Sequence, residues 1–353
     1  IFCAVAAAFP NARIDVVVGR TSVAKTLRRR LLQIESHIGL YGAGSKERGR
    51  RITVYVSDSL QHAPHDHDEA DFLLLDEVHE SPTATTLEEL AKYRMTRMYG
   101  ATASHNMRGD GADHRLEGFF GKTIFHMTYP EAQQLGLVVP IDVEFLRVQR
   151  CPTNLDSIRN DVERERRAIW TNDYRNEMIA AEARKHLEAG DQVLILVRTV
   201  EHVVNLHAFL PDFAMCYDKM HDSDRSTYTK RGLLNGNEPK MTPKRRDAMR
   251  EDFESGKLRA VIANDVWSTG VDFPQLGVMI RGDARCTKTM DVQAPGRLAR
   301  THDASGKARG LLIDCLDEFD DGFLSKSHKR RRSYQSFGWE VKVVDNGKSR
   351  LYG

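Results

Sequence analysis

The segment Asp76-Glu77-Val78-His79 directly follows the apolar run Phe72-Leu73-Leu74-Leu75, and this junction is the most informative part of the chain. Four consecutive apolar residues are typical of a strand that is buried on both faces, as in a parallel sheet. Ligands of open α/β sheets bind where such strands end. Adjacent carboxylates there can hold Mg²⁺ and polarise a water molecule for attack on a γ-phosphate. The junction therefore predicts an α/β fold with a nucleotide site at a strand end.

A second charged segment, Gln293-Ala294-Pro295-Gly296-Arg297-Leu298-Ala299-Arg300, lies far downstream. Its two arginines are three residues apart and share one face if the segment is helical. Arginine side chains neutralise the charge that develops on a phosphoryl group during transfer. Because the acidic pair and the arginines lie in different halves of the chain, we predict an ATPase whose site lies between two domains.

The composition is that of a globular protein, with 353 residues, 41% hydrophobic and 29% charged residues, and a net charge of only +2. This length allows two or three domains. The small net charge gives no overall attraction to nucleic acid, but clustered basic residues favour local contacts with phosphates. A solvated face is the alternative for each cluster. The clusters are Arg28–Arg30, Arg48–Arg51, Lys244–Arg246 and Lys329–Arg332.

The five cysteines are scattered without a C-x-x-C pair, which predicts reduced thiols and a cytoplasmic location. No apolar stretch approaches the roughly 18 residues that a membrane-spanning helix needs. The apolar segment 1–9 lacks a basic leader and an initiator Met, so we interpret it as the interior of a longer protein. We expect neither a membrane nor an obligate protein partner.

Short apolar strands alternate with helical segments in both halves of the chain, which predicts mostly parallel sheets flanked by helices. We expect strands at 14–18, 52–56, 72–76, 97–101, 193–197, 259–263, 278–280 and 311–314. Helices are expected at 1–8, 22–34, 87–93 and 245–254, and a glycine-rich loop at 39–49. The alternation pauses around Pro130, Gly136 and Pro140. We therefore divide the chain into a domain at 1–140, a linker at 141–170 and a domain at 171–353.

Two further segments carry polar residues at strand ends. Thr102-Ala103-Ser104 follows one expected strand, where hydroxyl groups can hydrogen-bond the acidic site or simply cap a helix. The segment Asn264–Pro274 follows another strand and contains Gly270, where the backbone can approach a ligand closely. Asp272 in the same segment can meet a ribose hydroxyl or orient an arginine. A purely structural loop is the alternative.

In this order and spacing, the segments resemble those of superfamily 2 DEAH-like helicases and translocases, of the type found in phage and bacterial DNA helicases. The acidic segment resembles the DEAH-type Walker B box, with Val78 in place of Ala. The other matching segments are Val16–Arg20 (motif Ia), Ile52–Leu60, Thr102–Ser104 (motif III), Val193–Arg198 (motif IV), Ala263–Pro274 (motif V) and Gln293–Arg300 (motif VI). The resemblance implies two tandem RecA-like domains and a P-loop NTPase that uses ATP and Mg²⁺.

The resemblance also implies roles for individual residues. Catalytic roles fall on Asp76, Glu77, His79, Gln293, Arg297 and Arg300. Asp76 would hold Mg²⁺, Glu77 would activate water, and Arg300 is the preferred arginine finger. Nucleotide contacts fall on Asp76, Gly270 and Asp272. Contacts with the nucleic-acid strand fall on Arg20, Thr21, Ser59, Thr102, Arg198, Asn264 and Trp267, although Asn264 stands where many relatives have Thr.

The chain departs from the family in one respect, because no phosphate-binding loop G-x-x-x-x-G-K-[ST] precedes the acidic segment. In Gly42–Lys46 the lysine follows the serine, and Gly121–Thr123 lies after the acidic segment and lacks the first glycine. We interpret both as ordinary loops. We expect the phosphate-binding loop just upstream of Ile1, because the segment 1–8 has the character of the helix that follows such a loop. Without that loop the chain is expected to bind ATP poorly.

Several alternatives stay open at this point. The segment Tyr129–Ile141 resembles the E-A-x-x-x-G-x-x-V-P-I link of DNA helicases, which favours DNA as the partner. An RNA helicase of a viral replication polyprotein, or a binding module without catalysis, can carry the same segments. The basic run Lys329–Arg332 precedes Tyr334 and Phe337, a pattern that can hold single strands or close the second domain. The histidine-rich segment 62–68 is interpreted as a solvated loop and not a metal site.

Overall fold

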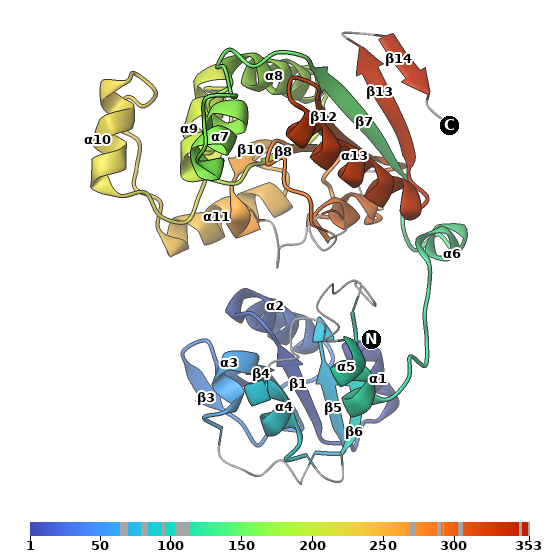
Figure 1. Cartoon of the computed structure of the whole chain (residues 1–353). Coiled ribbons are helices and arrows are strands. Elements are labelled where there is room, and N and C mark those ends of the chain that lie inside the picture. The colour runs from blue at the N-terminus through green and yellow to red at the C-terminus, as the bar shows by residue number, and fades with distance from the viewer. Residues whose placement is uncertain are drawn as a thin grey trace. The chain divides into compact units, whose positions relative to one another are not determined.

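The computed structural model describes residues 1–63, 70–78, 84–93, 96–102, 113–267, 273–287, 291, 293–302, 306–345 and 348–351. It consists of two compact units, Ile1–His126 and Met127–Gly353. Each unit is built on a mostly parallel sheet with helices packed on it (Figure 1). The predicted α/β class, with two sheets flanked by helices, is therefore confirmed. No helix in the described part of the chain is long and apolar enough to cross a membrane.

The sheet of the first unit has the strand order β3-β2-β4-β1-β5-β6. Its strands are β1 (Ile14–Val18), β2 (Ile38–Gly42), β3 (Ser45–Glu47), β4 (Ile52–Val56), β5 (Phe72–Leu75) and β6 (Arg97–Gly100). The helices are α1 (Phe2–Ala8), α2 (Thr21–Leu31), α3 (Ser57–Leu60), α4 (Ala84–Leu90) and α5 (Asp113–Phe120). All neighbouring strands pair in parallel except β2 and β3. The parallel strands therefore all end at one edge of the sheet, which we call the carboxyl edge.

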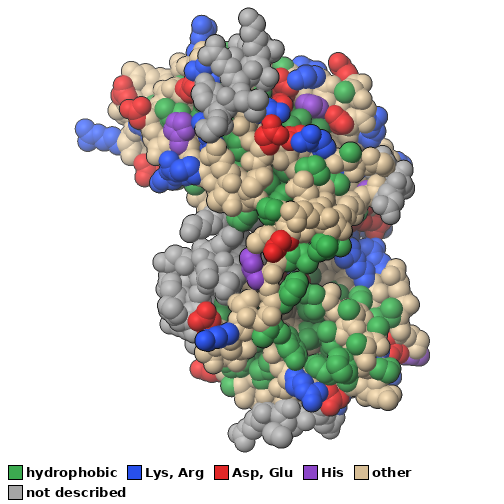
Figure 2. Space-filling model, turned by 90° about the vertical axis from the view of Figure 1, so that its right-hand side faces the viewer, with side chains coloured by type: hydrophobic (Ala, Val, Ile, Leu, Met, Phe, Trp, Pro, Cys, Tyr) green, Lys and Arg blue, Asp and Glu red, His purple; other side chains and the backbone are tan. Residues whose placement is uncertain are grey.

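The apolar strands form the core of this unit, as their sequences predict. Every residue of β1, β4 and β5 is buried, because helices or loops cover both faces of the sheet. The one buried carboxylate of β1, that of Asp15, accepts a hydrogen bond of 3.0 Å from Tyr93 Oη. In contrast, β6 is an edge strand with mostly exposed residues. Figure 2 shows hydrophobic side chains gathered on one face of the first unit, in the lower half of the view.

The expected loop at 39–49 is wrong, because this segment forms β2 and β3, an antiparallel hairpin. The turn runs through Gly42, Ala43 and Gly44, which all have positive φ. A Cβ at Gly39 would lie 2.9 Å from Thr53 Oγ1, and one at Gly42 would lie 2.8 Å from Val56 Cβ. The glycines therefore allow β2 to pack closely on β4 and are not a sign of irregular structure. The glycines of the Gly42–Lys46 segment are therefore explained by this hairpin turn, and no phosphate-binding role is needed to explain them.

The sheet of the second unit has the order β14-β13-β7-β12-β11-β8-β10-β9. Its strands are β7 (Ile141–Val148), β8 (Val193–Leu196), β9 (Ala214–Cys216), β10 (Ala260–Ala263), β11 (Val278–Arg281), β12 (Gly310–Asp317), β13 (Glu340–Asp345) and β14 (Lys348–Leu351). Helices are α6 (Tyr129–Gln134), α7 (Asp161–Glu165), α8 (Asp173–Glu188), α9 (Val200–Phe209), α10 (Asp222–Lys230), α11 (Pro243–Glu254) and α13 (Asp321–Ser336). Only β14 pairs antiparallel among these strands. The predicted strands and helices of both halves are confirmed to within three or four residues.

The segment 141–170, which we expected to be a linker, is part of the second unit. Strand β7 lies inside the sheet, between β12 and β13. The segment then continues through α7 into a π-helix, Arg166–Trp170, whose last three residues are buried. The boundary between the units falls at residues 126 and 127 and not at 140. The partners of β7 are more than 150 residues downstream, so no local pattern identifies it as a central strand.

A buried ionic network joins β11, β12 and α13. The Arg330 guanidinium is fully buried and donates to Asp314 through Nε (2.9 Å) and Nη2 (3.0 Å). Tyr334 Oη donates to the same carboxylate at 2.8 Å and accepts from Arg281 Nη1 at 2.7 Å. Arg281 Nη1 also donates to Asp291 at 2.7 Å. Because these charges are paired and hydrogen-bonded, they are tolerated inside the core and hold the three elements in one arrangement.

This network makes Arg330 a sensitive position. Replacing Arg330 by Ala leaves the buried Asp314 carboxylate without its main partner, which should cost about 3–5 kcal/mol in the free energy of unfolding. Arg332→Ala is the matched control, because Arg332 is exposed on the same helix, and it should change this energy by less than about 0.5 kcal/mol. All three tryptophans, Trp170, Trp267 and Trp339, lie in the second unit, so denaturation followed by tryptophan fluorescence reports on this unit. Equal losses in both variants would contradict the assignment.

Candidate nucleotide and nucleic-acid site

The predicted site residues of the first unit lie at the carboxyl edge of its sheet. Asp76 and Glu77 follow β5, Arg20 and Thr21 follow β1, and Ser59 and Thr102 lie just beyond β4 and β6. These four strands are neighbours and run parallel, so their ends meet at one edge. Arg20 and Thr21 are exposed, and the others are partly exposed. The fold thus brings residues from distant parts of the sequence to a common edge, while their individual roles stay predictions.

The acidic pair forms a turn that is held from both sides. Asp76 N donates to Val17 O at 3.0 Å, and Val78 N donates to Ala101 O at 3.0 Å. Between these bonds Glu77 has φ +47°, a left-handed conformation that is uncommon for residues with a side chain. Such conformations persist where the surrounding structure enforces them, and they are frequent at functional sites. Both residues are partly exposed at the strand end, where ligands bind in open α/β sheets, although one carboxylate oxygen of Glu77, Oε2, is buried.

The side chain of Val78 packs beneath this turn, against β6. It is buried, and a Cβ at Gly100 would come within 3.0–3.1 Å of three of its atoms. Gly100 therefore leaves the space that Val78 needs. This contact explains why a valine is accommodated in the acidic segment. The neighbouring His79 lies outside the described residues, as do Gly270 and Asp272.

In the second unit, Arg198 follows β8 at the carboxyl edge of that sheet. Its side chain is exposed, and Arg198 Nη1 donates to both oxygens of Glu165 at 2.7 and 2.8 Å. Asn264 follows the neighbouring strand β10 but is buried, and Asn264 Nδ2 donates to Asp218 Oδ1 at 3.1 Å. Arg198 is therefore accessible to a nucleic-acid strand, whereas the Asn264 side chain is engaged with Asp218.

The predicted contact of Trp267 with the nucleic-acid strand stays a prediction, but the Trp267 side chain is buried. The indole is only 2% exposed and packs against Phe253 and Phe273, with ring centroids 5.4 and 5.0 Å away. An aromatic ring that anchors the core cannot stack on a base. Trp267 instead contributes its carbonyl oxygen, which accepts a hydrogen bond from Arg297 Nη1.

The two arginines of the downstream segment do not share one exposed face. Residues Pro295–Ala299 form a 3-10 helix, and Arg300 follows in an extended conformation. Arg297 is 5% exposed, whereas Arg300 is exposed. The α-helical spacing that we assumed does not apply, because the helix is 3-10 and ends before Arg300. Gln293 lies just before the helix and is partly exposed.

The link segment Tyr129–Ile141 pairs with the backbone at Ala299 and Arg300. Val138 forms an isolated antiparallel bridge with Arg300, and Val139 N donates to Ala299 O at 2.7 Å. Tyr129 Oη in turn donates to Val139 O at 2.6 Å. Burial raises the pKa of Tyr129 to about 12, so the hydroxyl keeps the proton of this bond at neutral pH. The link therefore fixes the chain at the residue that we expect to act as arginine finger.

Sequence reasoning gave no indication of Lys307, which lies near the same arginine. Its amine is mostly buried and donates to Pro274 O at 3.5 Å. Burial, and in second place the positive charge of Arg300, lower the pKa of Lys307 to about 8. A single lysine in a polar stretch carries no motif, so only the tertiary structure reveals this proximity.

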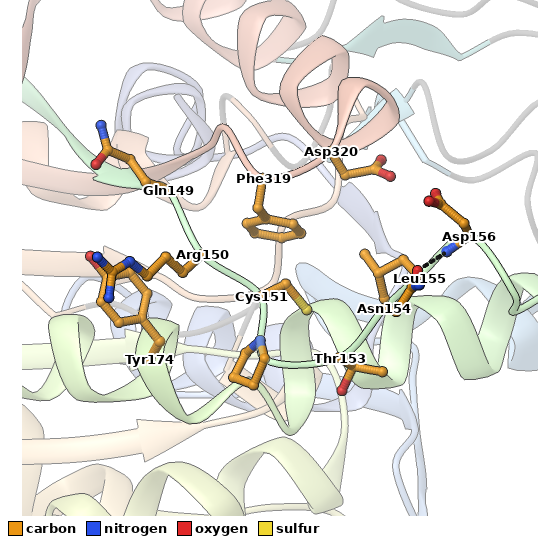
Figure 3. Close-up of a pocket in the computed structure, with 11 residues that line it drawn as sticks. Gln149, Arg150, Cys151, Thr153, Asn154, Leu155, Asp156, Tyr174, Phe319 and Asp320 are labelled. Atoms are coloured by element: carbon orange, nitrogen blue, oxygen red, sulfur yellow. Dashed lines mark hydrogen bonds between the residues drawn. The ribbon is translucent and has the colours of Figure 1, made fainter.

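A groove of about 640 Å³ lies at the end of β7, outside the predicted site. In Figure 3 the Phe319 ring lies above Cys151, with Arg150 and Tyr174 at one end and the carboxylates of Asp156 and Asp320 at the other. Burial raises the pKa of the Cys151 thiol, which disfavours the nucleophilic thiolate. Among the described residues no group of three or more His, Cys, Asp or Glu side chains could hold a metal ion. The histidines and aspartates of segment 65–68 lie outside the described residues.

Comparison with known proteins identifies part of the second unit. Residues 174–302 match the family model of the helicase conserved C-terminal domain. An 80-residue stretch is 37% identical to the ATP-dependent RNA helicase FAL1 of Lodderomyces elongisporus and covers 23% of this chain and 19% of that protein. A 158-residue stretch is 26% identical to the ATP-dependent RNA helicase DbpA of Bacillus subtilis and covers 45% and 27%. The matched stretches span less than a third of either relative.

Solved structures resemble nearly the whole chain. A fragment described as an HsdR subunit of a type I restriction enzyme from Vibrio vulnificus has a TM-score of 0.60 at 16% identity, over 96% of this chain and 59% of the other. S. cerevisiae Dbp5 bound to RNA and ADP BeF3 has a TM-score of 0.59 at 12% identity, over 94% and 77%. The restriction–modification enzyme LlaBIII bound to DNA has a TM-score of 0.57 at 14% identity, over 98% and 29%. At these identities the likeness shows the fold, which is the RecA-like helicase fold.

The different environments of the two arginines lead to a prediction about stability. Arg297→Ala removes a buried hydrogen bond to Trp267 O and should lower the free energy of unfolding of the second unit by about 1–3 kcal/mol. Arg300→Ala should change it by less than about 0.5 kcal/mol, because this side chain is exposed and the bridge to Val138 is made by the backbone. Denaturation followed by tryptophan fluorescence measures both variants. A larger loss for Arg300→Ala than for Arg297→Ala would contradict the two assignments.

Proposed function

We propose that the chain is the core of an ATP-dependent nucleic-acid helicase or translocase, in which ATP hydrolysis drives movement along a strand. The observation that carries this proposal is the helicase C-terminal domain match at residues 174–302, with the exposed Arg300 inside it. The acidic turn Asp76–Glu77 at the end of β5 supplies the complementary chemistry in the first unit. A binding module without catalysis needs neither a water-activating carboxylate nor an arginine finger.

The residues of the acidic turn fit a metal–nucleotide complex. Mg²⁺, when bound with ATP, neutralises phosphate charge. Asp76 offers a carboxylate oxygen, the ligand type that this ion prefers, at the carboxyl edge where nucleotides bind in such folds. Glu77 orients and deprotonates the attacking water. No G-x-x-x-x-G-K-[ST] sequence is present between residues 1 and 353 to cradle the phosphates, so full ATP affinity requires such a loop from outside these residues.

Arg300 supplies the positive charge for the transferring phosphoryl group, and Arg297 acts from the core by holding the segment to Trp267 O. His79, Gln293, Gly270 and Asp272 are proposed to complete the nucleotide side. The strand side is proposed to include Arg20, Thr21, Ser59, Thr102 and Arg198. These side chains suit contacts with the sugar–phosphate backbone, which gives weak sequence preference and steep salt dependence.

DNA is the first candidate for the strand. The segment Tyr129–Ile141 resembles the link of DNA helicases, and in this structure it pairs with Ala299 and Arg300. RNA is the second candidate, because the curated relatives with matching stretches are named RNA helicases. Stimulation of ATP hydrolysis by oligo(dT) and by oligo(U) separates the two. We expect the larger stimulation with oligo(dT), and a clear preference for oligo(U) would overturn this choice.

The catalytic proposal is tested with Glu77→Gln and Arg300→Ala in the full-length protein. Glu77→Gln should lower nucleic-acid-stimulated ATP hydrolysis by about 10²–10⁴-fold, because the amide cannot accept the proton of the attacking water. Arg300→Ala should lower it by about 10³-fold or more, as expected for an arginine finger.

Arg309→Ala is the matched control for Arg300→Ala. Arg309 is exposed, lies directly before β12 and pairs with Asp142, so its loss should leave turnover within about twofold of the wild type. Unchanged turnover in both Glu77→Gln and Arg300→Ala would refute the proposed function.

A further inference from the structure

A second cavity, of about 320 Å³, lies at the carboxyl edge of the second sheet, and we call it the α13 pocket. Its walls come from the segments that follow β8 and β11, from the end of α7 and from the first half of α13. The lining residues are Glu165, Arg198, Ala284, Arg285, Cys286, Thr287, Phe323, Lys326 and Lys329. Four of them are cations and one is an acid, which favours an anionic ligand.

Two of the four cations are compensated by neighbouring carboxylates. Arg285 donates to Asp283 Oδ2 at 3.0 Å and to both oxygens of Asp265, so its guanidinium is fully engaged. Arg198 is paired with Glu165, but only through Nη1. Among the described residues, no further hydrogen bond from Arg198 competes for Nε and Nη2. Arg198 can therefore donate to a second acceptor without losing Glu165.

The remaining positive charge comes from Lys326 and Lys329. They are three residues apart on α13 and both exposed, so they lie on one face of the helix. Lys326 Nζ lies 5.1 Å from the centroid of the Phe323 ring, a cation–π contact that leaves its charge uncompensated. Neither lysine forms an ion pair with a described residue. Two adjacent like charges on a helix destabilise it, and an anion between them relieves that repulsion.

The basic run at the end of the chain is thus divided by burial. Arg330 points into the core and is neutralised by Asp314, whereas Lys329 faces the α13 pocket. Tyr334, one of the aromatic residues that follow, is fully buried and serves the core. The run is therefore not a uniform basic surface: Arg330 serves the core, Lys329 lines the pocket and Arg332 is exposed outside the pocket lining.

We propose that the α13 pocket binds a backbone phosphate of the nucleic-acid strand, held by Lys326, Lys329 and Arg198. This inference rests on the proposed function, because it takes the carboxyl edge of the second sheet to face the strand. The sequence predicted a strand contact at Arg198, which follows β8. The pocket adds Lys326 and Lys329 of α13 to that contact. Thr287 also lines the pocket.

The test is equilibrium binding of a labelled single-stranded oligo(dT) to the full chain without ATP, followed by fluorescence anisotropy over a range of salt concentrations. The double variant Lys326→Gln/Lys329→Gln should bind about tenfold more weakly than the wild type near 0.1 M salt. The slope of log K against log salt should fall by up to about 1.4, which is about 0.7 for each cation that no longer displaces a counterion. Because no ATP is present, a failure of the catalytic proposal leaves this test intact.

The matched control is Lys185→Gln/Lys257→Gln, which removes the same charge. Lys185 lies in the last turn of α8 and Lys257 just before β10, so both are at the opposite edge of the same sheet. This control should keep affinity within about twofold and the slope unchanged. Thermal unfolding followed by tryptophan fluorescence should be the same in all three proteins, because the four lysines are exposed.

The pocket could also attract free phosphate, and a titration separates the two sources. Inorganic phosphate is titrated calorimetrically into the wild type and the pocket variant at constant ionic strength. The proposal is supported if Lys326→Gln/Lys329→Gln binds the strand more weakly than the wild type and the control variant does not. Strand affinity equal to that of the wild type overturns it, and inorganic phosphate binding that only the wild type shows would then assign the pocket to a free anion.

Discussion

Parallel strand pairing is the constraint on which the rest of this structure depends. It brings the ends of β1, β4, β5 and β6 to one edge of the first sheet, and with them residues that are far apart in the sequence. The acidic turn is part of the same arrangement, because its backbone is bonded to Val17 and Ala101 beside it. An antiparallel rearrangement would send half of these segments to the opposite edge and separate them. Strand direction therefore determines which residues lie together at the carboxyl edge of the first sheet.

In the second unit, burial decides which cations can act on a ligand. Arg330 and Arg297 are inside and make hydrogen bonds to Asp314 and to Trp267 O. Their sequence neighbours Lys329 and Arg300 are outside. A buried guanidinium needs hydrogen-bond acceptors, which are the Asp314 carboxylate for Arg330 and the Trp267 carbonyl oxygen for Arg297. Each of the two basic segments therefore contains a buried arginine that holds the structure and an exposed cation, Lys329 or Arg300, that solvent can reach.

The link segment Tyr129–Ile141 supports the backbone at Ala299 and Arg300 in the second unit. Tyr129, Val138 and Val139 use hydrogen bonds made by or to the backbone to hold the chain at Ala299 and Arg300. The side chain of Arg300 is then free of the need to anchor its own backbone. The exposed Arg300 side chain thus stands on a backbone that these hydrogen bonds hold in place.

The sequence alone determined the strands 14–18 and 52–56, the α/β class, and the place of Asp76 and Glu77 at the end of β5, because continuous apolar runs and alternating elements are local patterns. Only the tertiary structure decided the place of β7, the hairpin at 38–47 and the burial of Trp267. Each of these depends on partners distant in the sequence: β12 for β7, Thr53 and Val56 for the glycines, Phe253 for the indole. A local pattern records what a residue prefers, whereas long-range packing decides which preference is met.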